Sequence, residues 1–182
     1  MGGVHMRVAH TADLDAATLA AARALLDEVF AGELEDDDWE HALGGLHALA
    51  YDSGDETLVG HASLVQRRLL HGGRALRAGY VEAVGVRADR RRRGVGGAVM
   101  AALERAIHGA YDLGALGATD EAVPFYTGRG WERWRGRAHA LTPDGVRPTP
   151  DAEGAIYVLA TAGAPLDLDA SLTCDWRDGD VW

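Results

Sequence analysis

Apolar residues recur with two periods along the chain, and these periods predict alternating strands and helices. From Asp15 to Phe30 they follow helical spacing, and Asp13 or Asp15 is placed to cap that helix. A second helix is expected over 95–107, and a short one over 121–128 with a proline in its first turn. The expected strands lie at residues 6–10, 46–51, 57–66, 76–86, 113–117, 131–134, 138–141 and 155–159. This order indicates a mixed α/β (α+β) fold in which a meander of strands precedes a strand–helix–strand unit.

Short runs of glycine, aspartate and serine separate these elements, as expected for turns. Residues 52–55 are Asp-Ser-Gly-Asp, and His71-Gly72-Gly73-Arg74 is typical of a β-hairpin because paired glycines tolerate a positive φ. Residues 143–154 are expected to form a loop. The tail over 164–182 is acidic, and its aromatic-rich end indicates that it docks instead of fraying. No internal repeat divides the chain, so a single domain over 1–182 is expected.

The expected strand over 76–86 carries one residue that conflicts with its pattern. Alternate residues along a strand share a face, and the face that begins at Leu76 is otherwise apolar up to Val86. Glu82 lies in the middle of that row. A local conflict of this kind is typical of functional sites. A salt bridge to a nearby arginine is the structural alternative for this carboxylate.

The composition excludes several classes of protein. A length of 182 residues, with 47% hydrophobic and 25% charged residues, is typical of one globular domain with a sizeable core. Lysine and arginine number 18 against 28 aspartates and glutamates, and the resulting net charge of −10 argues against a general nucleic-acid binder. That charge permits a cationic ligand, and solubility alone also accounts for it.

Further absences bound the compartment. Cys174 is the only cysteine, which excludes a disulfide framework within the chain and a cysteine-rich metal site, so no metal is expected. No evident activating base accompanies Cys174, and we interpret it as structural. No stretch approaches 18 consecutive apolar residues, so no membrane span is expected. The first six residues lack the charged-then-apolar layout of a secretion signal. A cytoplasmic location is therefore expected.

The segment over residues 82–97, EAVGVRADRRRRGVGG, predicts a site for a phosphorylated ligand. A strand leads to a glycine-rich turn, and the turn opens an amphipathic helix. The N–H groups and the dipole at a helix N-terminus favour anions, and glycine lets the backbone approach a phosphate. Four arginines over 90–93 add guanidinium groups that fork onto phosphate oxygens. Neither the Gly-Lys-Ser/Thr of a phosphate-binding loop nor the spacing of the dinucleotide fingerprint is present.

Two motifs in this order resemble the Gcn5-related N-acetyltransferase (GNAT) superfamily. Arg91-Arg92-Arg93-Gly94-Val95-Gly96 matches its Arg/Gln-x-x-Gly-x-Gly/Ala signature. Downstream, its Ala-x-x-x-Tyr-x-x-x-Gly-aromatic segment is matched by Ala122, Tyr126, Gly130 and Trp131. Thr119 replaces a customary asparagine. The resemblance implies a mixed, mostly antiparallel sheet flanked by helices, with splayed central strands. It also implies that the turn over 91–96 cradles the pyrophosphate of acetyl-CoA.

Further segments narrow the resemblance and reach both ends of the chain. They are Phe30-Ala31-Gly32, Asp38-Trp39-Glu40-His41, Leu43-Gly44-Gly45, Gln66-Arg67-Arg68-Leu69, Gly79-Tyr80-Val81-Glu82, Gly109-Ala110-Tyr111, Cys174-Asp175-Trp176-Arg177 and Gly179-Asp180-Val181-Trp182. They resemble the aminoglycoside 2′-N-acetyltransferases of mycobacteria and related actinobacteria. The resemblance implies direct acetyl transfer from acetyl-CoA to the 2′-amino group of an aminoglycoside, antibiotic resistance, and a homodimer.

Direct transfer needs a proton acceptor for the amine, a donor for the oxyanion and a proton for the leaving thiolate. The resemblance assigns the oxyanion to the N–H of Val84, and it pairs Val84, Gly85 and Val86 with the pantetheine arm. Tyr126 is the implied acid, and a phenol suits this task because its pKa lies near that of a thiol. Glu82 is the leading base, directly or through water.

The implied substrate side of the site is acidic. The residues implied in substrate binding are Glu33, Glu82, Gly117, Asp151, Asp180 and Trp182. The terminal carboxylate of Trp182 is implied both in binding and in deprotonating the substrate amine, so the tail contributes to the site. Gly117 and Ala152 stand where a close relative in the resembled family carries serine and aspartate. This difference leaves Asp151 and Glu153 as substitutes and alters the expected drug range.

Two alternatives stay open at this point. One is an acetyltransferase for another small amine, such as a cell-wall amino sugar or a polyamine. The other is a CoA-binding regulatory module without turnover, and the presence of Glu82 and Tyr126 weighs against it. Thiol release from acetyl-CoA, measured with several amines, distinguishes these alternatives.

Overall fold

The computed structural model describes residues 3–182, so Met1 and Gly2, part of the stretch searched for a secretion signal, lie outside the described residues. The helices are α1 (Ala16–Val29), α2 (Asp36–His41), α3 (Val95–Ala110) and α4 (Val123–Thr127), with 3-10 turns η1 (Thr11–Asp13), η2 (Ala88–Arg90), η3 (Asp120–Ala122) and η4 (Pro150–Ala152). The strands are β1 (Val4–His10), β2 (Leu46–Asp52), β3 (Leu58–His71), β4 (Arg74–Val86), β5 (Leu113–Gly117), β6 (Glu132–Arg133), β7 (Ala138–Thr142), β8 (Gly145–Pro148), β9 (Ile156–Ala160) and β10 (Leu172–Cys174).

The chain forms two compact units. Unit 1 comprises residues 3–65 and Val81–Arg105, and unit 2 comprises Gln66–Tyr80 and Ala106–Trp182. The strands β3 and β4 and the helix α3 each contribute residues to both units. The expectation of a single domain stays a prediction. Within residues 3–182, no helix combines the length and the apolar character that a membrane span requires.

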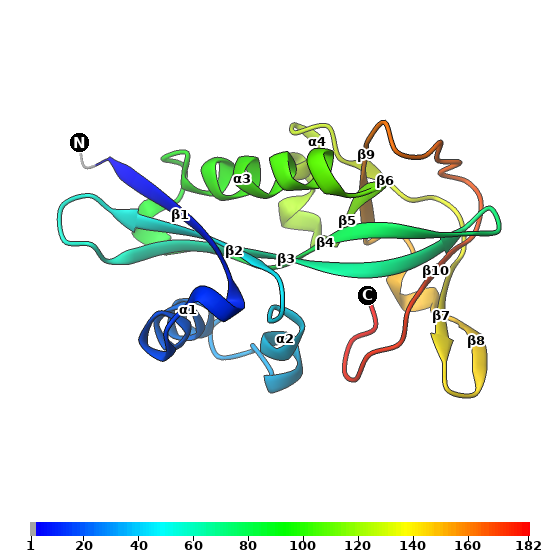
Figure 1. Cartoon of the computed structure of the whole chain (residues 1–182), viewed down its shortest axis with the longest axis horizontal. Helices are drawn as coiled ribbons and strands as arrows, with labels where there is room; N and C mark the ends of the chain where they lie inside the picture. The colour runs from blue at the N-terminus through cyan, green and yellow to red at the C-terminus, as the bar shows by residue number, and fades with distance from the viewer. Residues whose placement is uncertain (1–2) are drawn as a thin grey trace. The chain divides into compact units, whose positions relative to one another are not determined.

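In unit 1, helices pack on two faces of the strands (Figure 1). β2 pairs antiparallel with both β1 and β3. A Cβ on Gly60 of β3 would lie 2.6 Å from Val95 of α3, and a Cβ on Gly85 of β4 would lie 2.9 Å from Leu26 of α1. Glycine at these two positions therefore lets each helix pack closely on a strand. A buried cluster joins α1 to β2 and β3 through Leu14, Ala22, Leu25, Leu49 and Leu58.

The first helix begins where the sequence predicts it. Asp15 caps α1, because its Oδ1 accepts the N–H of Thr18 at 2.8 Å. The acidic run that follows also forms a helix, α2, although only its charge is evident from the sequence. Glu35 and Asp38 form a reciprocal capping box at its start.

Unit 2 contains a sheet with the strand order β6-β9-β5-β4-β3-β10-β7-β8. The pairs β4–β5 and β7–β10 are parallel, while β5–β9, β6–β9, β7–β8 and β3–β10 are antiparallel. The predicted hairpin joins β3 to β4, with φ values of 57° and 75° at Gly72 and Gly73. Trp131, Trp134 and Tyr157 are almost completely buried and dominate the core of this unit. The expected mixed, mostly antiparallel sheet is confirmed.

The expected parting of central strands is visible in the register of β4 and β5. They pair only from Ala78 to Tyr80, whereas β4 continues to Val86 and β5 to Gly117. At the paired end, a Cβ on Gly114 would lie 3.0 Å from Ile107 of α3, so the end of that helix packs closely on β5.

Two predictions about secondary structure are wrong. Residues 143–154 do not form a simple loop, because Gly145–Pro148 form β8, which pairs with β7. The expected alternation over 76–86 does not run unbroken, because Ala83 has a φ of 51°. A left-handed residue within a strand interrupts the alternation, so Val84 and Val86, which follow Ala83, do not simply continue the face of Leu76 and Glu82. The acidic tail, expected to dock, contributes the strand β10 to the sheet.

Candidate active site

The turn between β4 and α3 in unit 1 is open and rich in positive charge. Arg92 and Gly94 have φ values of 57° and 83°. The Gly94 carbonyl accepts the N–H of Ala98 at 2.9 Å, so the helix begins at Val95 and the N–H groups of its first turn have no partner four residues back. The side chains of residues 91–93 are exposed. N–H dipoles and guanidinium groups together fit an anionic diphosphate.

Arg90 belongs to the same arginine run but has a structural partner. It forms an ion pair with Asp52 at the end of β2, and the Asp52 side chain is only 6% exposed. The four guanidinium groups expected beside a phosphate are therefore reduced to those of Arg91, Arg92 and Arg93. Arg91 also fastens the turn to the strand, because its Nε donates to the Val86 carbonyl at 3.2 Å. The Val86 carbonyl, which belongs to the segment expected to pair with pantetheine, therefore already accepts a hydrogen bond from Arg91.

The strand that leads into this turn is irregular at Ala83. Its φ of 51° is uncommon for a residue with a Cβ atom. Two side chains of β3 hold the peptides on either side. Ser63 Oγ donates to the Glu82 carbonyl at 3.4 Å, and His61 Nδ1 lies 2.8 Å from the Ala83 carbonyl oxygen. The carboxylate of Glu82 belongs to a half-buried side chain beside this irregularity.

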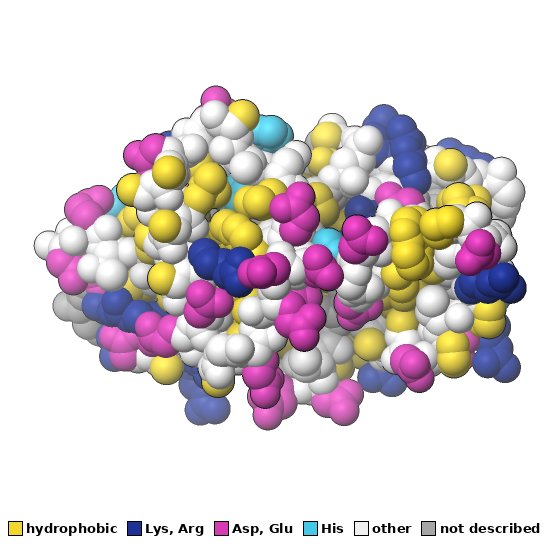
Figure 2. All heavy atoms as spheres, turned by 90° about the horizontal axis from the view of Figure 1, so that it is seen from below, with side chains coloured by type: hydrophobic (Ala, Val, Ile, Leu, Met, Phe, Trp, Pro, Cys, Tyr) yellow, Lys and Arg dark blue, Asp and Glu magenta, His cyan; other side chains and the backbone are white. Residues whose placement is uncertain are grey.

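Glu33, a second predicted substrate ligand of unit 1 beside Glu82, lies in the turn after α1. Its N–H donates to the Phe30 carbonyl at 3.0 Å, and its side chain is exposed. The helix α2 follows directly and adds further carboxylates. Figure 2 shows acidic side chains gathered on the face where α2 lies. One of these, Asp36, is paired with Arg23 at 2.9 Å. The rest of this acidic surface suits a cationic ligand.

Tyr126, the predicted acid, lies on α4 in unit 2. It is 6% exposed, and the rings of Phe125 and Trp131 pack edge-on against it at centroid distances of 5.2 and 6.2 Å. Burial raises the pKa of Tyr126 to about 12. The phenol therefore keeps its proton at neutral pH, as a proton donor must.

The C-terminal tail, residues 164–182, packs against other parts of unit 2, as expected. Trp182 is 8% exposed, and its indole N–H donates to Thr149 Oγ1 at 2.8 Å. The backbone N–H of Trp182 donates to Asp180 Oδ1 at 3.0 Å, and its main-chain oxygen accepts from the Arg177 guanidinium at 3.0 Å. Asp180 thus orders the tail with one oxygen while its side chain stays exposed.

Arg67 on β3 binds this tail through several hydrogen bonds. The sequence alone does not assign it a role. Its side chain is 4% exposed, and its Nε donates to Asp175 Oδ1 at 2.8 Å. Its second nitrogen donates to the carbonyls of Asp175 and Val181 at 3.0 and 2.7 Å. The guanidinium also lies 4.7 Å from the centre of the Tyr80 ring. The partners of Arg67 lie more than 100 residues away in the sequence, so no local pattern indicates its role. The sequence identifies the segment Gln66-Arg67-Arg68-Leu69 only through its resemblance to a family.

Of the two substituted positions, Gly117 has space for a larger residue, and Ala152 lies next to two carboxylates. A Cβ on Gly117, at the end of β5, would have only Tyr80 Oη within 4.0 Å. Near Ala152, Glu153 is engaged, since its carboxylate pairs with Arg137 at 3.2 Å and accepts the N–H of Ala138 at 3.4 Å. Asp151 is exposed. Of the two substitutes named from the sequence, Asp151 is the one whose carboxylate faces solvent.

Cys174 is a buried, neutral thiol. Burial raises its pKa to about 11, and its Sγ lies 3.3 Å from the Val181 carbonyl oxygen. A thiol with a raised pKa is a poor nucleophile at neutral pH. The structural interpretation of Cys174 is therefore supported.

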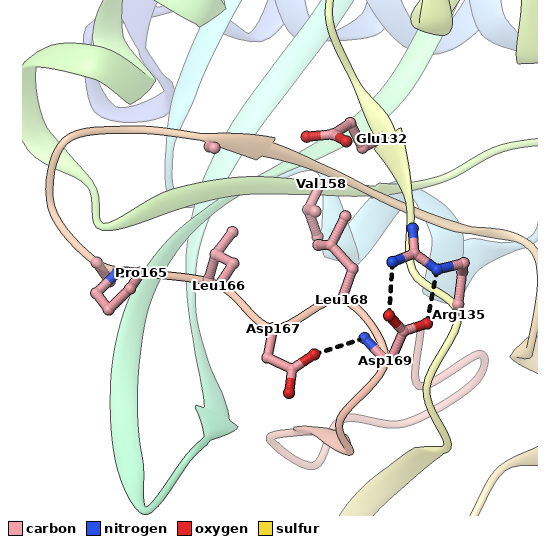
Figure 3. A pocket seen from close by; sticks show the side chains of 10 residues that line it. Glu132, Arg135, Val158, Pro165, Leu166, Asp167, Leu168 and Asp169 are labelled. Carbon is pink, nitrogen blue, oxygen red and sulfur yellow. Dashed lines mark hydrogen bonds and ion pairs between the residues drawn. The ribbon is translucent and has the colours of Figure 1, made fainter.

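A cavity of about 520 Å³ opens in unit 2 between the end of β9 and the loop after it (Figure 3). It is lined by Glu132, Arg135, Val158, Ala160, Ala164, Pro165, Leu166, Asp167, Leu168 and Asp169. None of these is a predicted site residue. Its cation, Arg135, makes two hydrogen bonds of 2.7 Å to Asp169, so its charge is already compensated.

The predicted site residues are divided between the two units. Unit 1 brings together Glu82, the irregular strand and the arginine turn, with Glu33 on the same unit. Unit 2 contains Gly117, Tyr126, Asp151, Asp180 and Trp182. Among these, Asp180 and Trp182 are directly bonded to each other. The first group suits an anionic acyl carrier, and the second combines a proton donor with carboxylates.

Comparison with known proteins agrees with this chemistry. The model of the acetyltransferase (GNAT) domain matches residues 10–134, which defines the class of the chain as an acetyltransferase. The chain is 51% identical over 179 residues to an aminoglycoside 2′-N-acetyltransferase of Mycolicibacterium fortuitum, covering 97% of this chain and 91% of that protein. The chain thus belongs to the GNAT family of acetyltransferases and, within it, to the family of the M. fortuitum enzyme.

Solved structures show the same fold at lower identity. Escherichia coli ElaA superposes with a TM-score of 0.58 at 21% identity, over 86% of this chain and 99% of that one. Eis1 from Mycobacterium abscessus gives 0.60 at 22% identity, and a GCN5-related N-acetyltransferase from Kribbella flavida gives 0.57 at 24%. This chain covers 75% and 74% of its own length in these two matches but only 33% and 34% of those longer proteins.

Proposed function

We propose that this chain transfers the acetyl group of acetyl-CoA to the 2′-amino group of aminoglycosides by direct attack. The observation that carries the proposal is the arrangement in unit 1, where an interrupted strand bearing Glu82 runs directly into an exposed arginine turn at a helix N-terminus. The family supports the acceptor, because the M. fortuitum relative is named for this activity.

The turn fits the anionic part of acetyl-CoA. Gly94 has a φ of 83° and no neighbouring atom within 4 Å of a Cβ placed on it, so the backbone is open to a phosphate there. We assign the diphosphate to the N–H groups of Val95 and Gly96 and to the guanidinium groups over residues 91–93. The strand segment over 84–86 would pair with the pantetheine arm. Acetyl-CoA supplies an acyl group activated as a thioester.

The proposed reaction uses three groups of this chain. Glu82 takes a proton from the substrate ammonium, directly or through water, and the free amine attacks the thioester carbonyl carbon. The N–H of Val84 donates to the oxygen as it becomes negative. When the C–S bond breaks, Tyr126 gives its proton to the departing sulfur, the acylated nitrogen loses its excess proton to water, and the neutral amide and the free thiol of CoA form. A phenol with a pKa of about 12 stays protonated until a thiolate appears beside it.

The tail supplies binding more readily than base catalysis in this proposal. The main-chain oxygen of Trp182 accepts a hydrogen bond from the Arg177 guanidinium, and such a partner favours the ionised form of a carboxylate and weakens it as a base. We therefore assign deprotonation to Glu82. Trp182 and Asp180 would hold a cationic amino sugar, with Glu33, Asp151 and the space beside Gly117 as further substrate contacts.

A second acceptor class is favoured by two positions. Gly117 carries no side chain and Ala152 no carboxylate, so neither adds a polar group to the substrate side of the site. Fewer polar contacts to a drug leave room for another small amine, such as a cell-wall amino sugar or a polyamine. The acetyl-transfer groups would be the same for either acceptor.

Release of free CoA thiol, measured with paired drugs, tests the proposal. Tobramycin carries a 2′-amine and amikacin a 2′-hydroxyl, so we expect turnover with tobramycin and none at that position with amikacin. Equal rates with both drugs would contradict the assigned position. No turnover with any aminoglycoside, but turnover with an amino sugar or polyamine, would favour the second acceptor class. Binding of acetyl-CoA without turnover of any amine would favour a regulatory module.

A homodimer and a cytoplasmic location stay predictions from the resemblance and the sequence. Sedimentation analysis at several concentrations tests the first, and fractionation of cells tests the second. Resistance is tested by expressing the chain in a susceptible host. We expect expression to raise the inhibitory concentration of tobramycin more than that of amikacin, relative to the host without the protein.

A further inference from the structure

Two histidines in unit 1 are completely buried and joined to each other by a hydrogen bond. His47 on β2 and His61 on the neighbouring β3 both have an exposed fraction of 0%. The distance from His47 Nδ1 to His61 Nε2 is 2.9 Å. The two outer ring nitrogens also have partners. His47 Nε2 lies 2.8 Å from Thr11 Oγ1, and His61 Nδ1 lies 2.8 Å from the Ala83 carbonyl oxygen. A continuous chain of hydrogen bonds thus ends on the irregular residue of β4.

The Ala83 carbonyl sets the direction of this chain. A carbonyl oxygen only accepts hydrogen bonds, so His61 Nδ1 carries the proton and Nε2 accepts from His47 Nδ1–H. His47 Nε2 then accepts from the Thr11 hydroxyl, which itself accepts the N–H of Gly44 at 2.9 Å. Every donor is directed towards Ala83, and both imidazole rings are neutral.

A fixed direction excludes a proton relay. Passing a proton along the chain would require every bond to reverse, but the Ala83 oxygen has no proton to give. Burial also keeps the rings neutral, because it lowers the pKa values of His47 and His61 to about 4. The ring of Trp39 lies at a centroid distance of 6.3 Å from that of His61 and shields it on one side. The chain of bonds is therefore static, and its effect is the orientation of one peptide group.

That peptide joins Ala83 to Val84. The described residues include no cis peptide bond, so its C=O and N–H point in opposite directions. Holding the Ala83 oxygen towards His61 therefore aims the Val84 N–H away from His61. The positive φ of Ala83 is a disfavoured conformation that persists only where surrounding groups hold it. We propose that His61, held by His47 and Thr11, is a positioning residue that orients the Val84 N–H as the oxyanion donor of acetyl transfer.

The inference rests on the proposed function, because the direction of the Val84 N–H matters only where an oxyanion forms beside it. The preceding peptide is held less tightly, since Ser63 Oγ lies 3.4 Å from the Glu82 oxygen while the bond from His61 measures 2.8 Å. A shorter bond to a buried donor defines the geometry better. Removing the His61 side chain should therefore free the peptide group between Ala83 and Val84.

Two substitutions at His61 separate hydrogen bonding from packing. His61→Asn keeps an N–H donor near the position of Nδ1 but loses volume, whereas His61→Leu keeps volume and has no donor. We expect kcat with acetyl-CoA and tobramycin to fall roughly 10- to 100-fold in His61→Leu, less than for complete loss of an oxyanion donor. His61→Asn is expected to recover most of this loss. The KM for acetyl-CoA stays unchanged in both, and the melting temperature falls more in His61→Asn because it leaves a cavity.

His71→Leu is the matched control. His71 is also a buried histidine, 8% exposed, with its Nδ1 3.3 Å from the Ser171 carbonyl oxygen and its Nε2 accepting the N–H of Asp167. We expect it to lower the melting temperature without changing kcat per folded molecule. If both leucine variants reduce kcat equally, or if folded His61→Asn does not recover activity, the inference is wrong.

The amide NMR signal of Val84 gives a readout that needs no turnover. Its position should shift in His61→Leu and return towards the wild-type position in His61→Asn. An unshifted signal in His61→Leu overturns the inference, whatever the acceptor proves to be. Absence of tobramycin turnover in the wild-type protein, together with the expected Val84 shift, overturns the proposed function alone.

Discussion

The arginine turn of unit 1 and the tail of unit 2 are built by opposite means. In the turn, the functional groups are N–H dipoles and exposed guanidinium groups set by two positive φ values within three residues, at Arg92 and Gly94. In the tail, order comes from buried side chains that reach across the sequence, with Arg67 bonded to Asp175 and to Val181. The turn depends on local backbone conformation, and the tail depends on long-range side-chain contacts.

This difference separates the expected effects of substitutions. A change in the turn should alter the affinity for acetyl-CoA with a small cost in stability, because few side chains pack there. A change under the tail should alter stability and the affinity for the amine, because the same hydrogen bonds support the fold and place Trp182. A single substitution that raised the KM for acetyl-CoA and the KM for the amine by the same factor would contradict this separation between the turn and the tail.

Arg67→Met should have the largest effect. Removing the guanidinium breaks its hydrogen bonds to the Asp175 carboxylate and the Val181 carbonyl, and because the Asp175 side chain is 39% exposed we expect the free energy of unfolding to fall by about 2–3 kcal/mol. In folded protein the KM for tobramycin should rise while the KM for acetyl-CoA stays constant. Arg68→Met is the matched control, since Arg68 is the exposed neighbour on β3. Equal melting temperatures for the two variants would contradict the role of Arg67.

Acid should destabilise unit 1 through its buried histidines. Burial lowers the pKa values of His47 and His61 to about 4, from 6.5 in the unfolded chain. Between these values the unfolded chain binds protons that the folded chain does not. The free energy of unfolding should therefore decrease as pH falls from 6.5 towards 4, by up to about 1.4 kcal/mol per pH unit for each histidine.

Urea unfolding at pH 7, 6 and 5 measures this slope. The double variant His47→Gln/His61→Asn should flatten it, because neither replacement titrates in this range. Parallel slopes for the wild-type protein and the double variant would mean that other groups cause the acid sensitivity. The electrostatic effect of neighbouring His10 also lowers the pKa of His47, so His10→Gln is the control for its contribution.

The same contrast explains which features the sequence predicts. The turn is predictable because glycine and arginine at fixed spacing leave a local signal, as does the cap at Asp15. Arg67 and the histidine pair are not, because their partners lie on other strands and only the folded sheet brings them together. The irregularity at Ala83 also leaves no trace, since alanine is not a residue that indicates a positive φ.

Gly94→Ala should act on the turn alone. The φ of 83° at Gly94 disfavours any residue with a Cβ atom, at a cost of about 1–2 kcal/mol. We expect a higher KM for acetyl-CoA and an unchanged KM for tobramycin. Gly109→Ala is the matched control: that glycine lies in α3 with open space around a Cβ and no positive φ, and alanine there should stabilise the helix slightly. A turn that tolerates alanine with full affinity for acetyl-CoA would contradict the close approach of a phosphate.

Thr149→Val should give the smallest effect, and it isolates Trp182 from the rest of the tail. The substitution keeps the shape of the side chain but removes the oxygen that accepts the Trp182 indole N–H at 2.8 Å, which costs about 1 kcal/mol. The contacts of Arg67 stay in place, so the melting temperature should fall by only a few degrees. If Trp182 binds the amine, the KM for tobramycin should still rise severalfold, with kcat nearly constant because Glu82 remains the base. A fall in kcat without a change in KM would instead make Trp182 part of the proton transfer. Thr173→Val, an equivalent change on β10, should alter neither constant.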